Sequence, residues 1–137
     1  DNGYIAGGMS SYVIEKFSFV SDGNTTYVGG LTQSKGYVTG NSSSTNGYVT
    51  GGWRPGYTDV IEKFPFASDV NAANVGSITV GRYGPAGNSS TVAGYTANGY
   101  STVGFNIIDK FPFASEATAT DVGDTATARY YVAGYQY

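Results

Sequence analysis

Cysteine and histidine are both absent from the 137 residues of this chain. Without cysteine no disulfide can form, and the redox compartment of the protein cannot be inferred. The common zinc sites and the Ser–His or Cys–His pairs of hydrolases are excluded for the same reason. Charged residues are few, at 12%, and seven Lys and Arg are outnumbered by ten Asp and Glu. Because a phosphate-binding surface needs clustered positive charge, nucleic acid is not an expected partner.

Long apolar runs are missing as well, so no segment is expected to insert into a membrane. The chain is rich instead in glycine, with 21 residues, and in tyrosine, with 13. Such a composition is typical of short strands joined by tight turns. The aromatic fraction of 15% is too high to favour disorder. The length allows a single domain.

A ten-residue motif occurs three times and organises the chain. Its most regular copy is VIEKFPFASD at residues 60–69, and the others lie at 13–22 and 107–116, each 47 residues from the next. A period of this size indicates a repeat architecture. Each unit contains four short segments of strand character separated by turns, which predicts an all-β fold built of blade-like sheets. Basic residues recur at the same interval, at Lys35, Arg82 and Arg129.

Each motif carries two phenylalanines two residues apart, which is the spacing of one face of a strand. We expect them to pack in the core, because a buried Phe stabilises a fold by about 1.5–3 kcal/mol. Proline between the two in the second and third copies predicts a strand that ends there, bulges or lies at an edge. The predicted core residues are Phe17, Phe19, Phe64, Phe66, Phe111 and Phe113.

The repeat resembles kelch repeats. It shares a double glycine after a strand, at residues 7–8 and 51–52, an aromatic-rich third strand, a fourth strand ending in Arg and a glycine-rich strand after it. The usual late Trp of a kelch unit is absent, and Phe stands nearby. The phrase IDKFPFAS at 108–115 also resembles kelch-like repeats of marine viral tail-fibre-like proteins and environmental bacterial surface proteins.

The resemblance implies three four-stranded blades of a β-propeller. Under it, residues 3–35 supply the second to fourth strands of blade one, 36–82 form blade two, 83–129 form blade three, and 130–137 form a terminal first-type strand. Three blades are fewer than the roughly four to eight that close a propeller. Two chains could form a six-bladed ring, the chain could belong to a longer array, or copies could join head to tail.

A homo-oligomer is therefore the expected assembly, with a surface glycan or a protein receptor as a further partner. We expect residues 130–137 to form a strand beside residues 3–8, between chains rather than within one. Such a strand would satisfy backbone groups that an open sheet edge leaves to water.

Catalysis has little support, because no nucleophile–base pair or repeated carboxylate pair is visible. Glu15, Glu62 and Asp109 each precede a lysine, and we interpret them as solvated cross-strand ion pairs. No catalytic residue, metal ligand or cofactor is predicted. Aromatic side chains in variable loops either cover blade edges or bind sugars and protein partners. The candidate binding residues are Trp53, Arg54, Tyr57, Tyr100 and Tyr12.

The function expected from these features is that of a non-catalytic structural or adhesion module. The resemblance implies a virion fibre or a cell-surface assembly, and hence an extracellular or virion-surface location. The alternative is a lectin-like propeller module that binds glycans through its loops. An enzyme on a propeller scaffold is the third interpretation.

Overall fold

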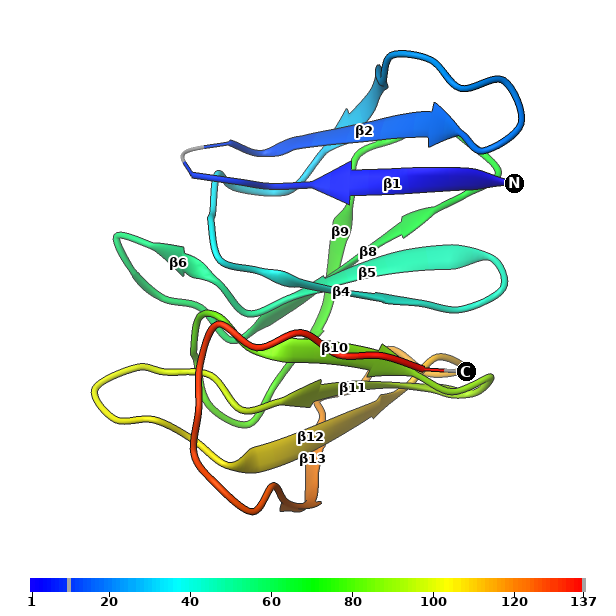
Figure 1. Ribbon diagram of the computed structural model, residues 1–137. Coiled ribbons are helices and arrows are strands. Elements are labelled where there is room, and N and C mark those ends of the chain that lie inside the picture. The colour runs from blue at the N-terminus through cyan, green and yellow to red at the C-terminus, as the bar shows by residue number, and fades with distance from the viewer. Residues whose placement is uncertain (10, 137) are drawn as a thin grey trace.

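The computed structural model describes residues 1–9 and 11–136, and in this part of the chain the fold is all-β (Figure 1). Three antiparallel sheets follow one another along the chain. The first is β1 (Asn2–Ala6), β2 (Val13–Ser18) and β3 (Thr26–Gly30). The second is β4 (Thr39–Ser42), β5 (Asn46–Thr50), β8 (Val60–Pro65) and β9 (Ala73–Ser77). The third is β10 (Ala86–Ser89), β11 (Ala93–Ala97), β12 (Ile107–Pro112) and β13 (Thr120–Asp124).

A short hairpin, β6 (Trp53–Arg54) and β7 (Gly56–Tyr57), extends the loop between β5 and β8. The expected terminal strand is not formed in the single chain. Residues 130–136 contain no strand and do not pair with β1, and Tyr137 lies outside the described residues. Instead this segment runs beside β10, where its backbone and Gln136 make hydrogen bonds.

A glycine faces the first phenylalanine of each motif across the sheet, as in the pair Gly47 and Phe64. A Cβ on Gly47 would lie only 2.3 Å from the Phe64 ring. The absence of a side chain therefore lets the ring fold over the neighbouring strand. Gly3 with Phe17 and Gly94 with Phe111 repeat this arrangement in the other two sheets.

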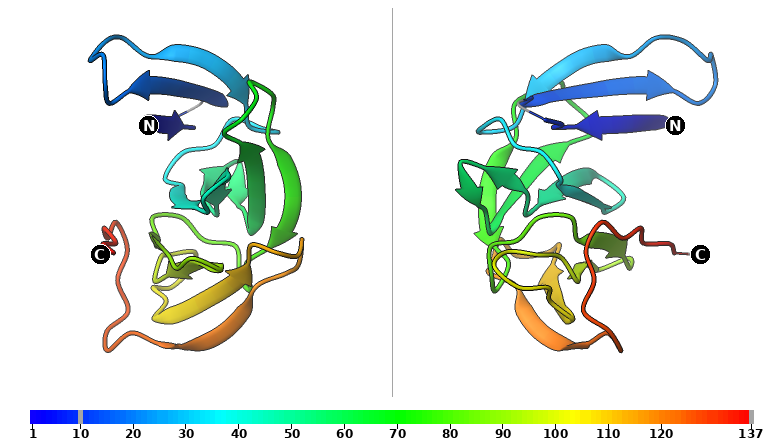
Figure 2. Two further views of the ribbon diagram at one scale, coloured as in Figure 1. Left: turned by 90° about the vertical axis from the view of Figure 1, so that its right-hand side faces the viewer. Right: turned by 60° about the vertical axis from the view of Figure 1, so that its left-hand side comes forward.

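The three sheets lie along an arc, with a face of each packed on the next (Figure 2). Ile14, Val28 and Leu31 of the first unit pack with Val49, Phe64 and Ala72 of the second. Tyr48, Ile61 and Ile78 of the second unit pack with Phe111 and Ala119 of the third. No helix long and apolar enough to cross a membrane occurs in the described residues.

The predicted phenylalanine core is only partly correct. Phe64 and Phe111 are buried, and Phe66 and Phe113 are half-buried against the two clusters. Phe17 is half-buried, however, and Phe19 is 60% exposed. The reason is position along the arc, because these two side chains belong to the first sheet and no described sheet precedes it.

Candidate assembly interface

An aromatic contact joins each sheet to the next. Tyr4 on β1 stacks on Phe66, with ring centroids 4.8 Å apart, and lies 5.5 Å from Phe64. One sheet further along, Tyr48 on β5 stacks on Phe113 at 4.8 Å and lies 5.5 Å from Phe111. Offset aromatic pairs of this kind add about 0.5–1.5 kcal/mol beyond their buried area. At both junctions between sheets, a tyrosine from one unit therefore packs on the phenylalanine pair of the next.

A buried ion pair joins the same neighbours. Arg82 Nη2 lies 2.9 Å from Asp109 Oδ2, and both side chains are fully buried. Lys35 and Glu62 form the equivalent pair between the first and second units. Burial lowers the pKa of Lys35, and the neighbouring Glu62 carboxylate opposes that shift. Burial likewise lowers the pKa of Arg82 against the opposing effect of Asp109.

A β-bulge in the partner strand lies opposite the acidic member of each pair. The strand register shifts between Ile61 and Glu62, and again between Ile108 and Asp109. Bulges re-aim side chains next to them. The Asp109 carboxylate also accepts hydrogen bonds from the backbone and the hydroxyl of Thr79, so the buried charge is well solvated by the protein.

The interpretation of these acids as solvated pairs with the following lysine was wrong for Glu62 and Asp109. Both are fully buried, and each binds the basic residue 27 positions before it, as the separation of Arg82 and Asp109 shows. The signal was present in the sequence, because the basic and the acidic position both recur every 47 residues. The pairing is not apparent within a single repeat unit, because the two partners lie in different units.

The lysines that follow these acids make outer ion pairs instead. Lys16 Nζ lies 3.0 Å from Asp69, and Lys63 Nζ lies 2.5 Å from Glu116. Both pairs span 53 residues and are partly exposed. Exposed pairs stabilise a fold by about 0–1 kcal/mol, so these two contribute little to the stability of the single chain.

The two ends of the arc carry unmatched members of this contact set. In the described part of the chain, Tyr95 covers no phenylalanine, and Lys110 and Arg129 make no ion pair. Lys110 instead lies 5.9 Å from the Tyr95 ring. The first sheet presents the opposite members, whose repeat equivalents are all paired inside the arc: Phe17, Phe19, Glu15 and Asp22.

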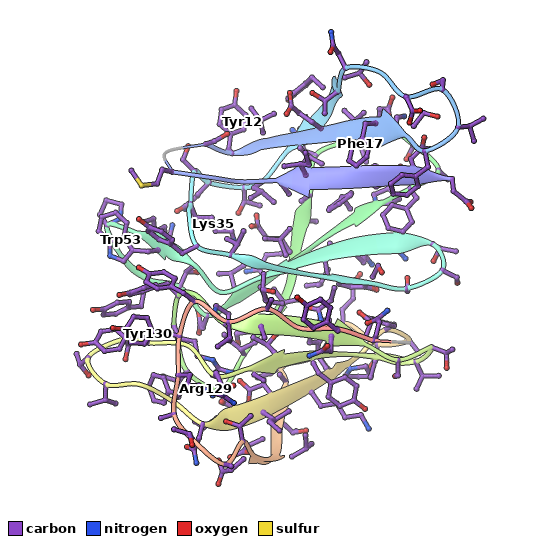
Figure 3. All side chains as sticks on the ribbon, viewed as in Figure 1. Tyr12, Phe17, Lys35, Trp53, Arg129 and Tyr130 are labelled. Atoms are coloured by element: carbon purple, nitrogen blue, oxygen red, sulfur yellow. The ribbon has the colours of Figure 1, made fainter. Side chains whose placement is uncertain are left out.

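A second surface is formed by the loops at one side of the molecule, where Tyr12, Trp53 and Tyr130 all lie (Figure 3). Tyr83 is at its centre, with four tyrosine rings between 5.6 and 5.9 Å away. Hydrogen bonding with Tyr131 raises the pKa of Tyr83. We call the following residues the tyrosine cluster: Tyr37, Tyr57, Tyr83, Tyr100, Tyr130 and Tyr131.

The cluster unites two of the five candidate binding residues, Tyr57 and Tyr100. Trp53 and Arg54 line a neighbouring groove with Met9 and Tyr37. Tyr12 lies apart, with its ring over Gly30. Sequence reasoning missed the remaining cluster members, although a tyrosine follows each of the repeated basic positions directly or after one glycine: Tyr37, Tyr83, Tyr130 and Tyr131.

Among residues 1–9 and 11–136 no group of acidic side chains is placed to hold a metal ion. Comparison with known proteins supplies no further assignment. No protein family matches this chain, and no curated protein sequence is similar to it.

Proposed function

We propose that this chain is a non-catalytic structural module whose copies join through the outer faces of the first and third sheets, the two end faces of the arc. The observation that carries the proposal is the complementarity of the two ends of the arc. Each end presents one side of the aromatic contact and of the two ion pairs that join neighbouring sheets inside the arc. Exposed apolar side chains such as Phe19, which is 60% exposed, commonly mark association surfaces when they gather on one face.

Moving the internal contacts forward by one repeat pairs the two ends of different copies. The outer ion pairs become Lys110 of one copy with Asp22 of the next. The buried ion pairs become Arg129 with Glu15. The aromatic contact becomes Tyr95 over Phe17 and Phe19, which would bury the exposed Phe19 ring. All three pairings follow from one displacement, and this agreement supports association in a defined register.

Two copies joined in this way form a closed ring of six blades, within the roughly four to eight blades of known propellers. A ring of two satisfies both ends of both copies, whereas an open chain of copies always leaves two ends exposed. We therefore favour a kelch-like propeller assembled from two chains. Its place in a virion fibre or at a cell surface is the part of the proposal that depends on the resemblance of the repeat phrase.

Native mass measurements test this proposal. We expect a particle of twice the 14.3 kDa chain. Lys110→Glu and Asp22→Lys should each weaken association about tenfold or more, because each places like charges together. The double variant should recover association. Lys63→Glu is the matched control, since it disturbs an equivalent pair inside the arc. A wild-type protein that stays monomeric at high concentration would refute the proposal.

Glycan binding is the second candidate function, and the tyrosine cluster is the observation that favours it. Tyr57 and Tyr131 are 43% and 60% exposed, although both belong to a packed group of rings. Exposed aromatic faces stack on sugar rings. Nearby Arg54, on the hairpin, supplies a hydrogen-bond donor.

A glycan array, followed by titration of any sugar that binds, tests this second function. Trp53→Ala should weaken binding and change thermal stability little, because Trp53 is 47% exposed. Tyr12→Ala is the matched control, because Tyr12 lies apart from both the tyrosine cluster and the groove beside Trp53. Binding that persists in Trp53→Ala, with a large loss of stability, would make Trp53 a packing residue.

A further inference from the structure

One edge of β1 is open, and a groove lies beside it. The equivalent central strands β5 and β11 are each paired on both sides, whereas β1 pairs only with β2 among the described residues. The groove is lined by Asn2, Tyr4 and Ala6 on β1 and by residues 38–42 around β4, with Phe64 and Phe66 also in its wall. Gln136 of the same chain lines it as well, but its side chain is held by the N–H of Ser89 on β10. In the second and third sheets this position beside the central strand is occupied by β4 and β10.

Residues 131–136 repeat the contacts of β4 and β10 without having a sheet of their own. The backbone N–H of Ser42 donates to Ser89 on β10, and the N–H of Ser89 donates to Gln136 at 2.6 Å. A Cβ on Gly87 would lie 2.3 Å from the Gly40 carbonyl oxygen, and a Cβ on Gly134 would lie 2.3 Å from that of Gly87. The segment therefore lies on β10 as β10 lies on β4.

The opposite side of this segment has no partner strand in the described chain, and Tyr135 is 91% exposed. One end of the arc thus has an inner strand position without a sheet, and the other has a sheet without an inner strand. We propose that the groove beside β1 accepts residues 131–136 of a second copy, and that two copies exchange these segments reciprocally. The inference rests on the proposed self-association and specifies how it is completed.

Pairing within one chain is disfavoured by the contacts that the segment already makes. To reach its own β1, the segment would have to leave β10 and lose the bonds from Ser89 to Gln136 and from Tyr131 to Gly84. A β1 that arrives from a second copy pairs with the segment in place. The end-face contacts bring the first sheet of the second copy to this position. Addition of a strand to an open edge is a common mode of protein association.

The repeat specifies the register of the exchanged strand. Thr39 on β4 faces Thr50 on β5, and their equivalents are Ala133 and Ala6. The offset between Tyr4 and Tyr48 is 44 rather than 47 because the first loop is three residues shorter. Both alanines are small, and Ala133 is exposed while Ala6 is half-buried. Facing residues of antiparallel strands have Cα atoms about 4.5–5.5 Å apart, which suits a disulfide.

Disulfide trapping tests the exchange directly, because the chain has no cysteine of its own. The double variant Ala6→Cys/Ala133→Cys should become a covalent dimer on mild oxidation. Mixing Ala6→Cys with a differently tagged Ala133→Cys chain should give the mixed dimer in large excess over either chain oxidised alone. Thr39→Cys/Thr50→Cys, the equivalent pair within one sheet, is the control and should form an internal bond without dimerising.

The other outcomes each overturn the inference. A ladder of larger covalent species would replace reciprocal exchange with an open chain of copies. A disulfide between positions 6 and 133 of the same chain, in a monomer, would show that the arc closes within one chain. Suppose that the native mass before oxidation is that of a dimer and that oxidation still gives no mixed disulfide. That result would overturn strand exchange but leave association through the end faces intact. A monomeric native mass for the unsubstituted chain would overturn both proposals.

Discussion

At the scale of single residues, equivalent positions differ sharply in environment because they differ in place along the arc. Arg82 is fully buried against Asp109, whereas Arg129 at the same repeat position is exposed. Phe64 is buried, whereas Phe17 is half-buried. In each comparison the two residues are identical and occupy the same position of the repeat. Their burial differs because a neighbouring sheet covers one of them and not the other.

Arg82→Met and Arg129→Met should therefore behave differently. Arg82→Met leaves Asp109 buried without its partner and should lower the free energy of unfolding by about 3–5 kcal/mol. This loss should be the same at every protein concentration. Arg129→Met should act only at concentrations where copies associate, because its predicted partner is Glu15 of another copy. Denaturant unfolding at a series of protein concentrations measures both effects.

Met is a suitable replacement at both positions because it keeps most of the aliphatic side chain. An Arg129→Met chain that loses stability equally at all concentrations would contradict the assignment. Such a result would mean that Arg129 contributes within a single chain.

At the scale of elements, the repeat period predicted much of the strand pattern, and the physical reason is local. Glycine pairs, the two-residue spacing of Phe64 and Phe66, and the proline between them all act within one strand and its turns. The bulge at Glu62 was not predictable in this way. It depends on the pairing of β8 with β9, which periodicity within one strand does not reveal. The same shift occurs between Ile14 and Glu15 in the first sheet, so a cation from a preceding unit is not its cause.

The terminal segment also shows that the sequence pattern of one segment does not decide its structure. Residues 130–136 have the sequence of an inner strand, and they lie where one would lie, yet they form no strand in the single chain. A strand needs a hydrogen-bonding neighbour, and β1 is at the other end of the arc. Similarly, the loop aromatics were identified as candidate binding residues, but the role of Tyr83 as centre of the tyrosine cluster depends on packing between units.

At the scale of the whole molecule, the proposed ring of two copies could receive its missing strand in two ways that differ only in chain connection. The inner strand of the first sheet can come from a second copy, or it can be attached to β1 directly. In the second sheet, Ser43, Ser44 and Thr45 connect β4 to β5. Tyr137, one inserted serine and Asp1 would supply a connection of the same length.

A circularly permuted chain should therefore separate strand exchange from association through the end faces. In this chain residues 130–137 and the inserted serine precede Asp1, and the chain ends at Arg129. We expect its first sheet to gain a fourth strand from the same chain, so that no segment is exchanged. The end faces remain, and two copies should still associate through Lys110, Asp22 and the aromatic contact. Dissociation then breaks only the end-face contacts, since domain-swapped strands no longer link the copies.

Subunit exchange between two fluorescently labelled populations, followed by energy transfer, measures the difference. The permuted dimers should exchange subunits faster than the original dimers, because the original dimers must also separate two shared strands. A chain that ends at Arg129 without permutation is the control, and it should associate least because the inner strand is missing altogether. Equal exchange rates for the original and permuted dimers would show that the terminal segment does not connect the copies. Faster exchange with an unchanged native mass would show that the end faces are enough to form the dimer. It would also show that the exchanged strands slow its dissociation.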